Sequence, residues 1–113
     1  MTSVPPALQP LLSSYRQLLE RRFGDRLLDV RLYGSWARGD ADDDSDVDVA
    51  VVVAGLTDAE RSDAIDLAFA AWRSAGPDGP LIDPLVWSDT HRADRLAAER
   101  RLALDVEREG IPA

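Results

Sequence analysis

The segment 32–53 constrains this chain more than any other, because a glycine-containing turn leads through acidic residues into a strongly apolar run. Asp46 and Asp48 alternate with valines where that run starts. In a β-strand alternate side chains share one face, so both carboxylates would project from one side while the valines enter the core. Two carboxylates about 4 Å apart repel by about 4 kcal/mol at an effective dielectric constant of about 20. A divalent metal ion bound by both acids would relieve this repulsion.

A glycine-serine pair, Gly34 and Ser35, lies upstream of the acids, with ten residues between Ser35 and Asp46. Glycine allows close approach of the backbone, and serine can cap a short helix whose first N–H groups point at an anion. The turn and the acids together predict a site for a metal ion and nucleotide phosphates. A calcium loop of the EF-hand type fits less well, because it requires glycine at Ser45 and glutamate at Val51.

Gly34-Ser35 and Asp46-x-Asp48 at this spacing resemble the signature of the DNA polymerase beta-like nucleotidyltransferase superfamily. The extended pattern, Gly-Ser-x-Ala-Arg-Gly followed by Ser-Asp-x-Asp, is most similar to the minimal nucleotidyltransferase family. The resemblance covers residues 27–110. It implies an α/β fold in which a small mixed β-sheet is packed with helices.

The resemblance also implies a third carboxylate on a neighbouring strand. Asp83 matches this position, since it lies among apolar residues of the predicted strand 81–87. Asp89 is the alternative, although its position between serine and threonine is typical of a helix cap. Pro84 cannot donate a ladder hydrogen bond and indicates an edge strand.

By resemblance, we expect Asp46, Asp48 and Asp83 to bind Mg²⁺, with Asp83 also accepting a proton from the attacking hydroxyl. Gly34 and Ser35 are expected to hold the distal phosphates of ATP.

Two residues inside the turn have more than one interpretation. We interpret Arg38 as a phosphate clamp, and an ion pair with Asp40 is the alternative. Trp36 could stack on a base, cover a partner or pack against the amino-terminal helix, and we expect packing.

The remaining pattern predicts one domain, 1–113, with three or four strands covered by helices. The expected helices are 7–23, 57–75 and 90–109, and the expected strands are 27–33, 47–53 and 81–87. Strand 47–53 should be the middle of the sheet, because it is almost continuously apolar. We expect the first strand to place Leu28, Val30 and Leu32 on one side. The apolar residues of the second helix are Ile65, Leu67, Ala68, Phe69 and Trp72.

The amino-acid composition limits the classes of partner that this chain can bind. The net charge of −8, from 21 acidic and 13 basic residues, opposes binding to nucleic acid. Cysteine is absent, so disulfides and thiolate metal ligands are excluded. No apolar run approaches the roughly 20 residues of a membrane span, and the start of the chain lacks a signal pattern. We therefore expect no membrane partner and a cytoplasmic location.

The family resemblance implies transfer of AMP from Mg-ATP to a hydroxyl. Members commonly act as antitoxins that adenylylate a tyrosine of a cognate HEPN-type toxin, and we expect this function. The alternatives are a small-molecule nucleotidyltransferase of the aminoglycoside type, which could share its cleft in a homodimer, and an antitoxin that acts by binding alone. The tail 111–113 departs from the family's leucine-tyrosine ending, so we assign it no role.

Overall fold

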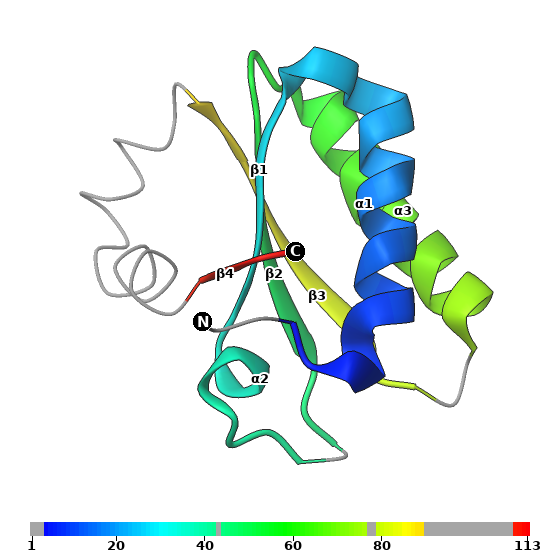
Figure 1. The fold of residues 1–113 in the computed structure, drawn as a ribbon. Helices are drawn as coiled ribbons and strands as arrows, with labels where there is room; N and C mark the ends of the chain where they lie inside the picture. The colour runs from blue at the N-terminus through cyan, green and yellow to red at the C-terminus, as the bar shows by residue number, and fades with distance from the viewer. Residues whose placement is uncertain (1–3, 43, 77–78, 90–109) are drawn as a thin grey trace.

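The computed structural model describes residues 4–42, 44–76, 79–89 and 110–113, and within them it shows a sheet with helices packed against it (Figure 1). The elements are η1 Pro6–Leu8, α1 Gln9–Phe23, η2 Gly24–Arg26, β1 Leu27–Tyr33, α2 Ser35–Arg38, β2 Val47–Val53, α3 Asp58–Ala75, β3 Ile82–Ser88 and β4 Ile111–Pro112. The predicted helix 90–109 lies outside the described residues.

The sheet has the strand order β3-β2-β1-β4 in the described part of the chain. β1 runs antiparallel to β2 and β4, whereas β2 and β3 are parallel. The predicted α/β fold with a small mixed sheet is therefore confirmed. β2 lies inside the sheet, as its apolar sequence predicts, and β3, which carries Pro84, is at an edge.

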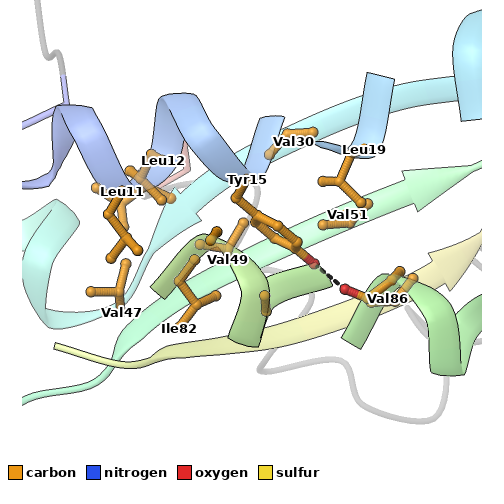
Figure 2. Close-up of a cluster of buried hydrophobic side chains, with 14 of the residues drawn as sticks. Leu11, Leu12, Tyr15, Leu19, Val30, Val47, Val49, Val51, Ile82 and Val86 are labelled. Carbon is orange, nitrogen blue, oxygen red and sulfur yellow. Dashed lines mark hydrogen bonds between the residues drawn. The ribbon is translucent and has the colours of Figure 1, made fainter. Parts of the chain in front are cut away.

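The hydrophobic core lies between the sheet and the helices α1 and α3, which are side by side on one face of the sheet (Figure 1). Tyr15 of α1 points into this core, and its hydroxyl donates a hydrogen bond of 2.9 Å to the carbonyl of Ala64 in α3 (Figure 2). Burial raises the pKa of Tyr15. The alternating strand residues that face the helices are Val30, Leu32, Val47, Val49, Val51, Val53, Ile82 and Val86.

Helix α3 begins with a capping box, in which Thr57 and Glu60 each bond to the other's backbone N–H. Its buried face is formed by alanines at 64, 68 and 71, and these small side chains let the helix approach α1 and the sheet closely. Ile65 and Phe69 lie outward instead, 36% and 53% exposed. These two apolar side chains therefore lie away from the core.

Strand β1 also departs from strict alternation. Its register against β2 shifts between Leu27 and Asp29, as in a β-bulge. Leu27 consequently packs against the core, while Leu28 is 53% exposed, so the expectation that Leu28 is buried is wrong.

The tail forms part of the sheet. Ile111 and Pro112 pair with β1, and the N–H of Ala113 donates to the carbonyl of Val30 at 2.9 Å. Ile111 is buried in the core. Among the described segments, no helix is both long enough and apolar enough to span a membrane.

Candidate active site

The glycine turn joins β1 to the short helix α2. Gly34 has a φ of 75° and a ψ of −152°, and it occupies the N-cap position of α2. The carbonyl of Gly34 accepts hydrogen bonds from the N–H groups of Ala37 and Arg38. Among the described residues no side chain caps this helix, and Ser35 is its first residue. The expectation that Ser35 is the cap is therefore wrong, because the chain reverses at the preceding glycine.

Strand pairing places three polar side chains in one row across the sheet. Tyr33 of β1 pairs with Asp48 of β2, and Asp48 pairs with Asp83 of β3. Directly paired residues project from the same face of a sheet. Because Val47 and Val49 face the helices, this row lies on the opposite face, next to the turn at one end of β2.

The electrostatics of this row confirm that its members lie close together. Burial raises the pKa of Asp48, and the charges of Asp83 and Asp46 raise it further, while Arg38 opposes them. Burial, together with the charges of Asp48 and Asp83, raises the pKa of Tyr33 to about 12. The fold thus brings the three predicted acids to one end of the sheet.

The carboxylate of Asp48 lies directly against the turn. A Cβ atom added to Gly34 would lie 2.3 Å from Oδ2 of Asp48, closer than real Cβ contacts allow. Glycine at 34 therefore serves two purposes, since it adopts the positive φ and leaves space for the carboxylate.

The donor set fits a hard divalent cation such as Mg²⁺, because Asp46, Asp48 and Asp83 offer carboxylate oxygens. A bound cation would also relieve the repulsion that raises the pKa of Asp48. In the part of the chain that the structure describes, no three His, Cys, Asp or Glu side chains already stand in positions to hold a metal ion. At least one of the three carboxylates must therefore shift for all three to reach one ion, and their role as ligands stays a prediction.

The alternative acid, Asp89, lies beyond the opposite end of β3. Five residues of β3 lie between Asp83 and Asp89, and six steps of about 3.3 Å place the two residues about 20 Å apart. Oδ1 of Asp89 accepts hydrogen bonds from the N–H of Gly55 at 3.1 Å and from Oγ of Ser88 at 3.2 Å. Asp89 thus stabilises the loop after β2, and Asp83 is the acid that lies beside Asp48.

Arg38 and Trp36 also have defined contacts. Nε of Arg38 lies 3.2 Å from Oδ2 of Asp40, so the ion pair considered as the alternative is present, and a phosphate contact stays a prediction. The Trp36 ring packs against the core, and its Nε1 donates to the carbonyl of Ser45 at 3.1 Å. Packing of Trp36 is therefore confirmed for the core, and its contact with the amino-terminal helix stays a prediction.

Tyr33 is the member of this row that sequence reasoning missed. Its position immediately before Gly34 was visible, but a tyrosine at a strand end is ordinary, and only the pairing with β2 places it beside Asp48.

A glycine turn packed against carboxylates on adjacent strands places the chain among α/β proteins with an acidic site at one end of a mixed sheet. Residues 12–103 match the model of the nucleotidyltransferase domain family, and the chain belongs to this family.

The proteins similar to this chain include a curated relative and a solved structure. A protein of Methanocaldococcus jannaschii named "Putative protein adenylyltransferase" is 41% identical over 49 residues, which is 43% of this chain and 33% of that protein. The match therefore spans about a third of the relative's length. A crystal structure titled as a "putative nucleotidyltransferase" from Sulfolobus solfataricus aligns with a TM-score of 0.40 and 19% identity, covering 83% of this chain and 84% of that one.

Proposed function

We propose that this chain transfers AMP from Mg-ATP to the hydroxyl of a tyrosine on a cognate HEPN-type toxin and thereby acts as its antitoxin. The observation that carries the proposal is the row in which Asp48 and Asp83 lie on adjacent strands, with the Asp48 carboxylate against Gly34. Membership of the nucleotidyltransferase domain family supports the reaction class.

The binding of substrate would be divided between the turn and the acids. The turn at Gly34 and Ser35 would hold the distal phosphates of ATP through its backbone, and Asp46, Asp48 and Asp83 would hold Mg²⁺. The cation would supply positive charge to the triphosphate and to the attacking oxygen.

Asp83 would accept the proton of the attacking hydroxyl. The tyrosine oxygen forms a bond to the α-phosphorus, the bond from that phosphorus to the pyrophosphate oxygen breaks, and pyrophosphate leaves. Asp83 suits a macromolecular acceptor, because its side chain is exposed on β3, an edge strand among the described residues.

Two observations support a protein acceptor. The similar protein of M. jannaschii is named as a protein adenylyltransferase. The net charge of −8 opposes approach of a nucleic acid.

The site is tested by calorimetry with ATP and magnesium. The Asp46→Asn and Asp48→Asn double variant should lose metal-dependent binding while its circular dichroism spectrum is nearly unchanged. A matched control removes two charges from the loop that precedes these acids, by Asp42→Asn and Asp44→Asn. The loop should keep its conformation, because an asparagine at 42 keeps the Oδ1 atom that accepts a hydrogen bond from the N–H of Asp44. Undiminished binding in the first double variant, or equal loss in the control, would refute the assignment.

The acceptor is tested by incubating the chain with labelled ATP, magnesium and the product of the neighbouring gene. We expect label on a tyrosine of that partner, located by mass spectrometry. Label only on an aminoglycoside or RNA would identify a different transferase. A tight complex without any label would identify an antitoxin that acts by binding alone.

A further inference from the structure

Helix α3 presents two of its bulky apolar residues to solvent. Phe69 is 53% exposed and Ile65, one turn earlier, is 36% exposed, whereas the buried face of the helix is built from alanines. Adjacent large side chains at this spacing form one apolar stripe on the outer face of the helix.

Two opposite charges border the stripe. Asp66 and Arg73 are exposed, and they lie about one turn before and one turn after Phe69. Each residue turns the helix by about 100°. Viewed along the helix axis, Asp66 is therefore rotated from Phe69 by about 60° and Arg73 by about 40°, both in the same direction. Within the described segments neither residue forms an ion pair.

Glu60 and Asp63, which also lie on α3, form ion pairs within the same chain. Glu60 pairs with Arg26 and Arg22, and Asp63 pairs with Arg22 at 3.0 Å. These contacts fix α3 against α1, so the stripe around Phe69 remains on the outer surface.

We propose that this stripe is the contact surface of a homodimer in which α3 packs antiparallel against α3 of a second copy. With the two-fold axis passing beside Phe69, the two Phe69 rings meet, and Asp66 of each copy lies opposite Arg73 of the other. A two-fold axis of this kind is perpendicular to both helices and keeps equivalent residues on the same side, so both ion pairs form together.

The order of the charges favours a second copy over an unrelated partner. The surface is complementary to itself in the antiparallel arrangement, whereas a parallel arrangement would oppose Asp66 to Asp66 and Arg73 to Arg73. α3 covers the face of the sheet opposite the acids, so this dimer leaves the candidate active site open (Figure 1).

The contact is small. A helix of 18 residues is about 27 Å long, and a single helix pair buries less surface than a standard stable interface. The dimer is therefore weak and depends on protein concentration.

Sedimentation equilibrium over a wide concentration range tests the proposal. The wild-type chain should change from monomer to dimer, and Phe69→Ser should raise the dissociation constant at least about tenfold. Leu28→Ser is the matched control, because Leu28 has the same exposure of 53% but lies on β1, and it should leave the dissociation constant unchanged.

The charge order is tested with Asp66→Arg and Arg73→Asp. Each variant alone opposes like charges and should weaken dimerisation about tenfold or more. A mixture of the two variants should form heterodimers with the wild-type affinity, since the two arginines of one variant then lie opposite the two aspartates of the other. Circular dichroism verifies that each variant is folded. A wild-type chain that stays monomeric at every concentration, or a mixture that stays as weak as the single variants, would overturn the proposal.

Discussion

The Gly34→Ala variant tests how the turn and the acids depend on each other. An added Cβ would lie 2.3 Å from Oδ2, 3.2 Å from Cγ and 3.4 Å from Cβ of Asp48. The carboxylate is the far end of a rotatable side chain, so it can turn away at small cost to the fold, but it then leaves the position in which it faces the turn. A φ of 75° with a ψ of −152° is a region nearly restricted to glycine, and alanine there costs about 1–3 kcal/mol.

The Gly24→Ala variant separates the backbone strain caused by alanine from the displacement of the Asp48 carboxylate. Gly24 has a φ of 57° and a ψ of −130°, close to the backbone conformation of Gly34, and no atom of the described segments lies within 4 Å of its added Cβ. Urea unfolding should show a loss of about 1–3 kcal/mol for both variants. Calorimetry with Mg-ATP should show at least about tenfold weaker binding for Gly34→Ala alone, which corresponds to about 1.4 kcal/mol. Normal binding by Gly34→Ala, or an equal loss in Gly24→Ala, would refute this reasoning.

Four further variants test the proton acceptor and the fold. Asp83→Ala should slow transfer by about 100- to 10,000-fold through loss of the proton acceptor, whereas Asp89→Ala should keep the rate; a normal rate in the first contradicts its role. Tyr15→Phe should lower the free energy of unfolding by about 1 kcal/mol in urea, since its buried hydrogen bond to α3 is lost, and an unchanged midpoint would contradict this. Hydrogen bonds from Arg26 lower the pKa of Glu60 from 4.5 to about 2, so its stabilising effect is complete above pH 4.5 and is lost as the pH falls toward 2. The stability difference between wild type and Glu60→Gln should shrink over this pH range, and a constant difference would contradict the pKa shift.

Features that depend on short stretches of chain were predictable from the sequence. The expected helices 7–23 and 57–75 and the apolar strand 47–53 each depend on local geometry, and the structure confirms all three. The spacing of Gly34, Ser35 and the aspartates likewise carried the family resemblance, which the match over residues 12–103 supports.

The local sequence pattern does not show which side of a helix or strand is buried where packing with other elements determines it. In α3 the bulky Ile65 and Phe69 lie outward, because the alanines on the neighbouring face allow a closer approach to α1 and the sheet. At Leu28 the bulge against β2 changes the alternation, and a bulge depends on the partner strand.

The sequence by itself determined the chemistry of the candidate site, because the turn and the alternating aspartates lie within one short segment. Only the tertiary structure decided which distant residues join it. The parallel pairing of β2 with β3 places Asp83 beside Asp48 and carries Asp89 to the far end, and the antiparallel pairing with β1 adds Tyr33. Strand register is set by the packing of the whole sheet between residues far apart in the chain, so no local pattern contains it.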